Sequence, residues 1–139
     1  MSPPVLLTQA QWIEICAHLT AGLPEEACGL LAGRAGQTHK VYLITNARHS
    51  PTRYEMEPRE LVQALEEMDE NEWDLIGIFH SHPAGPPTPS PTDMAEAYYP
   101  DSAYVICSLD RGEWQARAFE IREGRAREIE LQIGAGEAI

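Results

Sequence analysis

The sequence is poor in cysteine and in basic residues, and both shortages limit what the protein can be. It contains only three cysteines, Cys16, Cys28 and Cys107, and no Cys-x-x-Cys pair. We therefore expect no disulfide framework, and we expect the protein to work in the reducing cytoplasm. Lys and Arg total 10 against 22 Asp and Glu, so the net charge is −12. We therefore expect no basic face for nucleic-acid phosphates or for an anionic membrane.

Long apolar runs are missing as well. No stretch approaches the ~20 apolar residues of a membrane helix, and the N-terminus lacks the regions of a secretory signal. What is present is an ordinary globular composition, with 43% hydrophobic and 23% charged residues in 139. This length suits one domain over residues 1–139. We expect its core to span about 6–133 and the tail 134–139 to be flexible.

Periodicity and turn residues predict an α/β domain with a mixed sheet. Apolar spacing and capping residues indicate helices over 8–22, over 58–68 and from Ser90 or Thr92 to Ala97. Apolar or alternating runs bounded by turn residues indicate strands. These are expected over 29–32, 41–44, 73–79, 104–109, 114–121 and 127–133.

The most informative segment follows the apolar run 73–79. His80 and His82 are two residues apart, so both imidazoles point to the same side of an extended chain. Asp93 lies eleven residues beyond His82, after a stiff stretch with five prolines that can turn the chain back. Two imidazoles and one carboxylate form a three-ligand catalytic zinc set, which leaves a fourth position for water. The pattern favours one Zn²⁺ per chain.

A zinc hydrolase also needs a general base beside the attacking water. Glu25 and Glu26 stand at the start of the apolar run 29–32, and either carboxylate could serve. Cys28 is close by in sequence, but its apolar neighbours predict a buried thiol. It also lacks an evident partner base, which disfavours nucleophilic thiol chemistry.

At this point the sequence resembles the JAMM (MPN+) metalloproteases. Their signature is an upstream Glu, then His-x-His-Pro, six residues, Ser, two residues and Asp. Every position is filled, in order, by Glu26, His80, His82, Pro83, Ser90 and Asp93. The resemblance extends over about residues 24–109. It implies a single MPN domain, a curved mixed β-sheet flanked by helices, similar in outline to cytidine deaminases.

The resemblance also implies roles for these residues. His80, His82 and Asp93 would bind zinc, and Glu26 would be the general base and acid. Ser90 would hydrogen-bond the oxyanion of the tetrahedral intermediate, a role compatible with capping a helix.

The family cuts isopeptide or peptide-like bonds at the Gly-Gly tail of ubiquitin or ubiquitin-like proteins. A branch of short stand-alone prokaryotic members resembles this chain more closely. These act on sulfur-carrier proteins of ubiquitin-like fold, and some release cysteine from a carrier–cysteine adduct in cysteine biosynthesis. The segment 53–61, and the mere 53 residues between Glu26 and His80, suit that branch. After Asp93 there is no room for the insertion with which eukaryotic deubiquitinases grip ubiquitin.

The expected partner is thus a ubiquitin-like or sulfur-carrier protein with a Gly-Gly C-terminus, and exposed strand edges would permit a homodimer. The segment Tyr54–Met56 is a candidate edge for pairing with that tail. It could equally be a loop that leads into the second helix.

Four alternatives bear on this interpretation. A desampylating isopeptidase that acts on protein conjugates differs only in substrate. A nucleobase deaminase needs His-x-Glu and Pro-Cys-x-x-Cys, which are absent. A non-haem iron enzyme fits the ligand types, but has no part for the Glu and Ser. A non-catalytic MPN scaffold would be expected to have lost ligands, and none is lost.

Overall fold

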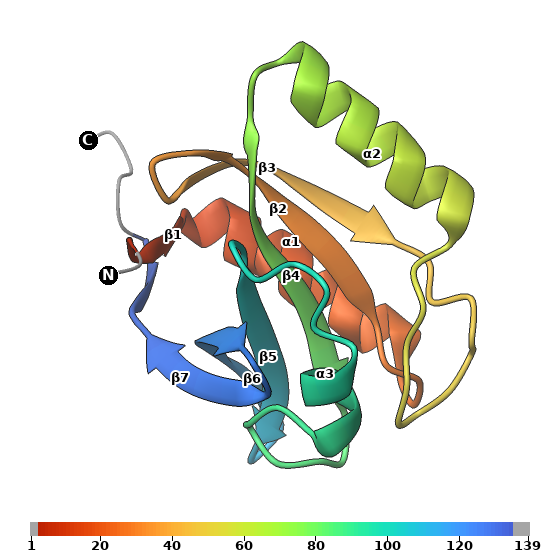
Figure 1. The fold of residues 1–139 in the computed structure, drawn as a ribbon. Helices are drawn as coiled ribbons and strands as arrows, with labels where there is room; N and C mark the ends of the chain where they lie inside the picture. Colours follow the sequence, from red (N-terminus) through yellow and green to blue (C-terminus); the bar gives the residue numbers. More distant parts are fainter. Residues whose placement is uncertain (1–2, 135–139) are drawn as a thin grey trace.

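A computed structural model describes residues 3–134 (Figure 1). Eight strands and three helices are interspersed along this part of the chain, which confirms the α/β class. They are β1 (Val5–Leu7), α1 (Gln9–Gly22), β2 (Cys28–Arg34), β3 (Gln37–Ile44), α2 (Pro58–Glu70), β4 (Asp74–His82), α3 (Pro91–Ala95), β5 (Ala103–Asp110), β6 (Glu113–Arg122), β7 (Arg125–Ile129) and β8 (Leu131–Ile133).

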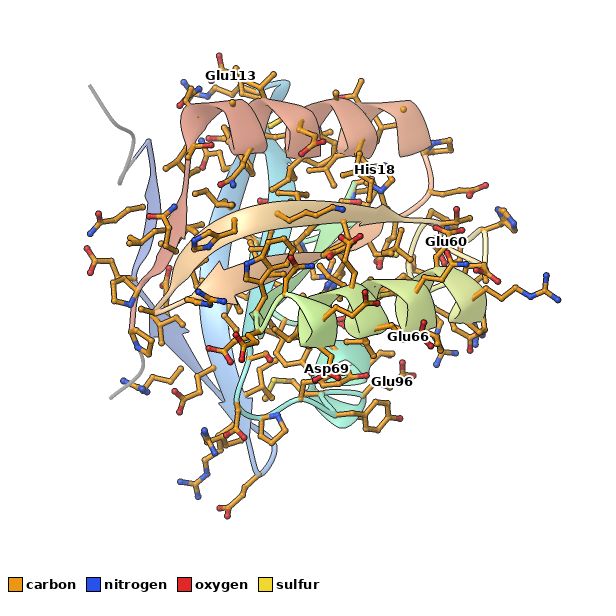
Figure 2. The ribbon with its side chains drawn as sticks, turned by 90° about the horizontal axis from the view of Figure 1, so that it is seen from above. His18, Glu60, Glu66, Asp69, Glu96 and Glu113 are labelled. Carbon is orange, nitrogen blue, oxygen red and sulfur yellow. The ribbon has the colours of Figure 1, made fainter. Side chains whose placement is uncertain are left out.

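The strands form one mixed sheet in the order β7-β6-β5-β4-β2-β3-β1-β8. Strand β4 lies near its middle, antiparallel to β2 and parallel to β5. Helix α1 covers one face of the sheet, whereas α2 and α3 lie on the other (Figure 2). Each face has its own apolar core. The α1 face centres on residues such as Leu19 and Phe79, and the other on residues such as Met68 and Ile78.

Local sequence explains where the helices begin. Thr8 caps α1, because its hydroxyl accepts a hydrogen bond from the Gln11 N–H at 3.1 Å and the Gln11 side chain accepts one from the Thr8 N–H at 2.9 Å. Helix α2 begins with Pro58, and the preceding Glu57 carboxylate accepts the Glu60 N–H at 2.8 Å. The predicted starts of these two helices are therefore confirmed.

Several predicted strand boundaries were wrong. The strand expected over 73–79 continues through His82, and the one expected over 41–44 begins at Gln37. The strand β1 was not predicted, and it is only three residues long. The single last strand expected over 127–133 is two strands, because β7 pairs with β6 whereas β8 pairs with β1.

The chain ends are only partly described. The Gly134 N–H donates a hydrogen bond to the Leu7 carbonyl at 2.7 Å, so the first residue of the expected tail is held against β1. Residues 135–139, the rest of that tail, lie outside the described residues, and the domain limits remain a prediction. Among residues 3–134, no helix is long and apolar enough to cross a membrane.

Candidate metal centre

Two histidines and one aspartate converge at the C-terminal end of β4. His80 and His82 are both strand residues, which corrects the expectation that they follow the strand. The Asp93 carboxylate bridges them, with Oδ1 3.1 Å from His80 Nε2 and Oδ2 2.9 Å from His82 Nε2. The two Nε2 atoms are 3.1 Å apart. All three side chains lie in the site with little or no exposure, at 0%, 5% and 9% respectively.

The start of α3 orients Asp93. Ser90 caps this helix, and its hydroxyl accepts the Asp93 N–H at 3.0 Å. In return Asp93 Oδ2 accepts the Ser90 N–H at 2.8 Å, which completes a capping box. The reciprocal bonds turn the carboxylate back toward β4. The residue pair that begins the helix therefore also fixes the position of a candidate ligand.

This donor set fits a zinc ion. The candidate ligand atoms of His80, His82 and Asp93 all lie within 4.8 Å of one another. His82 Nδ1 lies 2.8 Å from the Pro86 carbonyl and donates to it, so Nε2 is the ring nitrogen left to bind an ion. Two imidazoles and a carboxylate are a common catalytic zinc set.

Glu26 approaches the same centre from the segment just before β2. In the sheet Cys28 is paired with His80, and Glu26 comes just before this paired stretch. Ser81 links the two segments further, since its hydroxyl accepts the Ala27 N–H at 2.9 Å and its own N–H donates to the Ala27 carbonyl at 2.9 Å. The Glu26 side chain is buried, and its Oε1 has no hydrogen-bond partner in the structure.

Burial and neighbouring charges set the protonation of these groups. Burial raises the pKa of Glu26 to about 7, although the nearby His82 charge opposes this rise. Burial likewise lowers the pKa of His80, which favours the neutral imidazole that binds metals. Burial alone would raise the pKa of Asp93, but hydrogen bonds from His80 and His82 hold it well below its usual value.

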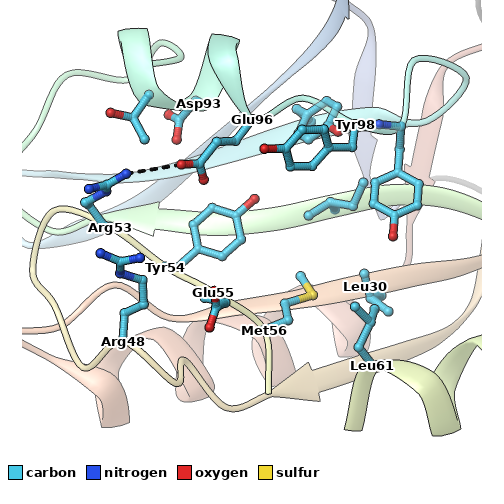
Figure 3. A pocket seen from close by; sticks show the side chains of 14 residues that line it. Leu30, Arg48, Arg53, Tyr54, Glu55, Met56, Leu61, Asp93, Glu96 and Tyr98 are labelled. Atoms are coloured by element: carbon cyan, nitrogen blue, oxygen red, sulfur yellow. Dashed lines mark hydrogen bonds and ion pairs between the residues drawn. The ribbon is translucent and has the colours of Figure 1, made fainter. Parts of the chain in front are cut away.

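A cleft of about 360 Å³ opens beside Asp93 (Figure 3). Its polar end carries Asp93, Glu96 and two arginines, Arg48 and Arg53, and Arg53 pairs with Glu96 at 3.2 Å. Its other end is apolar. The apolar lining includes Leu30, Met56, Leu61 and Ile78.

The segment Tyr54–Met56 lines this cleft and also leads into α2. Met56 forms an antiparallel bridge with Asn46. The flanking hydrogen bonds run from Ala47 N–H to the Glu55 carbonyl at 2.8 Å and from Glu57 N–H to the Thr45 carbonyl at 3.0 Å. Because backbone groups alternate along extended chain, those of Met56 face away from Asn46. The segment is therefore the expected approach to the second helix, and its use as an edge for a tail stays a prediction.

Sequence reasoning missed two residues of the site. Asn46, expected in a polar loop, is buried and donates from Nδ2 to the carbonyls of Glu26 at 2.9 Å and Arg53 at 3.1 Å. The Tyr54 ring stacks on the His80 ring, with centroids 4.4 Å apart. Nothing in the sequence indicates these contacts, because Asn46 is a lone Asn at a strand end and Tyr54 is a Tyr within a loop.

Comparison with known proteins matches this chain to one family. Residues 8–122 match the family model of prokaryotic homologues of the JAB domain. A desampylase of Pyrococcus furiosus is 38% identical over 111 residues, which are 80% of this chain and 79% of that protein. A CysO-cysteine peptidase of Mycobacterium tuberculosis is 34% identical over 133 residues, 93% of this chain and 91% of that one. The solution structure of protein DSY2949 from Desulfitobacterium hafniense has a TM-score of 0.82 and 37% identity, covering 93% and 92% of the two chains.

Fold and site define a JAB/MPN domain that carries a His-His-Asp candidate metal centre. The chain belongs to the family of prokaryotic JAB-domain homologues, as a hydrolase of the JAMM peptidase type.

Proposed function

We propose that this protein is a zinc-dependent peptidase that hydrolyses the bond after the Gly-Gly tail of a ubiquitin-like or sulfur-carrier protein, for example to release cysteine from a carrier–cysteine adduct. The observation that carries this proposal is the convergence of His80, His82 and Asp93 next to the buried Glu26 carboxyl. The relatives support the substrate class, since one is named a desampylase and another a CysO-cysteine peptidase.

His80, His82 and Asp93 would hold the metal ion. A zinc ion bound there would supply Lewis-acid chemistry and lower the pKa of a bound water toward about 7. The chain's own contribution is to fix the three ligand atoms, because two of them come from one central strand and the third from a capped helix start.

Glu26 would move the protons of the reaction. As water adds to the scissile carbonyl carbon, the Glu26 carboxylate takes a proton from it. As the carbon–nitrogen bond breaks, the same side chain gives that proton to the departing nitrogen. A pKa near neutrality suits both steps, and burial supplies it.

Ser90 would stabilise the oxyanion that forms on the carbonyl oxygen. Its hydroxyl already accepts one hydrogen bond, from the Asp93 N–H, and the described residues offer its own O–H no acceptor. That O–H is therefore available to donate to developing negative charge, a role that can contribute a few kcal/mol, roughly 2.7–4 where it has been measured.

The cleft beside Asp93 would receive the tail. Met56 presents its N–H and C=O on the side away from Asn46, so an extended tail can pair with it by β-augmentation. The apolar end of the cleft suits a hydrophobic side chain of the carrier, and the polar end places Arg48 and Arg53 near Asp93. A cysteine adduct ends in a free carboxylate that these arginines can attract, which favours it over an isopeptide bond to lysine.

The test compares leaving groups on one carrier. A Gly-Gly carrier is linked to cysteine, to cysteinamide, and through an isopeptide bond to a lysine peptide, and release is followed by mass spectrometry. We expect the zinc-loaded protein to cleave the cysteine adduct fastest and the cysteinamide adduct more slowly. Chelator-treated protein should cleave none and should recover when zinc is restored. Cleavage confined to the isopeptide would favour a desampylase-like function, and no cleavage of any carrier substrate would contradict the proposal.

A further inference from the structure

The two histidines of the metal centre are supported in different ways. The outer ring nitrogen of His82 donates to the Pro86 carbonyl at 2.8 Å. The corresponding Nδ1 of His80 is buried and has no hydrogen-bond partner in the structure. A ligating histidine nearly always donates from its second nitrogen to a carbonyl, carboxylate or water, which holds the ring in place. His80 lacks that support, and its side chain is 0% exposed.

An aromatic ring, in place of a hydrogen-bond acceptor, supports the His80 side chain. Tyr54 lies against His80, with ring centroids 4.4 Å apart and the ring planes inclined by 27°. This is a stacked arrangement. Among the described residues, the only other ring contact of either histidine is the edge-on contact between His80 and His82. Tyr54 also lines the cleft (Figure 3), so the ring that stacks on the buried His80 is itself part of the cleft wall.

The backbone on both sides of Tyr54 is tethered. Asn46 Nδ2 donates to the Arg53 carbonyl at 3.1 Å, and Asn46 Oδ1 accepts the Glu55 N–H at 3.1 Å. One buried side chain thus fixes the residues before and after the tyrosine. These tethers hold the ring over His80, and within residues 3–134 the Tyr54 hydroxyl makes no hydrogen bond that would do so.

We propose that Tyr54 is a positioning residue of the metal centre, whose ring fixes the plane of His80 and so aims Nε2 at the ion. The proposal rests on the metal site described above. Metal binding draws electron density from an imidazole, and the negatively polarised face of a tyrosine ring attracts the positively polarised imidazole. The stack should therefore be stronger in the metal-loaded protein than in the metal-free protein.

The experiment measures zinc affinity by competition with a chelator, and the visible spectrum of the cobalt-substituted protein. Tyr54→Phe keeps the ring and should match the parent in both. Tyr54→Leu and Tyr54→Met remove the ring and should bind zinc about 10- to 100-fold more weakly, the usual loss when a ligand's outer support is removed. They should also shift the cobalt bands. Tyr98→Leu, which changes an exposed tyrosine of the same cleft, should bind zinc as the parent does.

The outcomes separate this proposal from the proposed function. If the metal-free variants unfold at the parent's temperature and Tyr54→Leu or Tyr54→Met binds zinc as tightly as the parent, the positioning role is wrong. An equal loss in Tyr54→Phe would also overturn it, because the hydroxyl and not the ring would then matter. If the parent itself binds no zinc, the metal site and the positioning role fail together.

Discussion

The two faces of the central sheet differ in what their buried residues do. The α1 face is covered by a continuous apolar core that includes Leu19, Phe79 and Val105. The opposite face is apolar over part of its area, but at the end of β4 it carries His80, His82 and the adjacent Glu26. Because side chains alternate along a strand, β4 contributes Phe79 to the α1 core and turns Ile78 and the two candidate histidine ligands to the other face. Stability and chemistry should therefore respond to mutation on different faces.

The largest expected effect is on the site face. Glu26→Gln should lower kcat/KM for a cleaved carrier substrate by about 10²- to 10⁴-fold, because an amide cannot accept the proton. Its melting temperature and zinc content should stay at the parent's values, since the Glu26 Oε1 makes no hydrogen bond that the change would break. Steady-state kinetics, thermal unfolding and metal analysis check this together. A variant that cleaves as fast as the parent would exclude Glu26 as the base.

The second prediction concerns the buried thiols. Cys28 lies on the site face, and burial raises its pKa to about 12. The thiol stays protonated below that pH, so at pH 7 its reactive thiolate is about 10³-fold scarcer than in a free cysteine of pKa ≈ 8.5. Iodoacetamide should therefore label Cys28 and the buried Cys107 only after unfolding in urea. Rapid labelling of Cys28 in the native protein would indicate that this thiol takes part in the chemistry.

A mutation on the α1 face should have the opposite effect to Glu26→Gln: it should lower stability and leave activity unchanged. Leu19 is 0% exposed within the core beneath α1, and Leu19→Ala should lower the free energy of unfolding by about 2–5 kcal/mol. Cleavage per folded molecule should be unchanged at temperatures well below the midpoint. Urea denaturation and kinetics on the same preparation measure both quantities. A matching loss of kcat would show that the two faces are coupled.

The smallest effect is expected from a change at Asn46, whose side chain links Glu26 to the loop that carries Tyr54. Asn46→Ala leaves the carbonyls of Glu26 and Arg53 without their donor and should destabilise the fold by about 1–3 kcal/mol. It should also lower kcat, because Glu26 and the Tyr54 loop lose a shared anchor. Asn71→Ala is the matched control. Among the described residues the Asn71 side chain bonds only the Glu67 carbonyl at the exposed end of α2, and Arg34 binds its backbone carbonyl, which the change keeps, so kcat should stay at the parent's value.

The grouping of the three candidate ligands could be predicted from the sequence because its information is local. His80 and His82 share a strand, and a Ser three residues before Asp93 can form a capping box whatever the rest of the fold does. The contact between Tyr54 and His80 could not be predicted in this way. It joins residues far apart in sequence and depends on where the loop before α2 lies.

The strand expected over 127–133 was wrong for a similar reason. Its alternating pattern runs through Glu130 without a break, so periodicity alone reads it as one strand. The break comes from pairing, because β7 joins β6 at one margin of the sheet and β8 joins β1 at the other. Glu130 is the single residue between the two strands, and its carbonyl accepts a hydrogen bond from the Val5 N–H at 2.9 Å.

The placement of β7 and β8 at the two margins of the sheet has a consequence for self-association. The outermost strands, β7 and β8, are only five and three residues long, and β7 is largely exposed and carries charged side chains. Short, charged margins offer a poor template for another chain to extend the sheet, which protects a β-rich protein from edge-to-edge aggregation. They also narrow the routes to a homodimer, because a strand-to-strand interface at either margin would have few backbone groups with which to form.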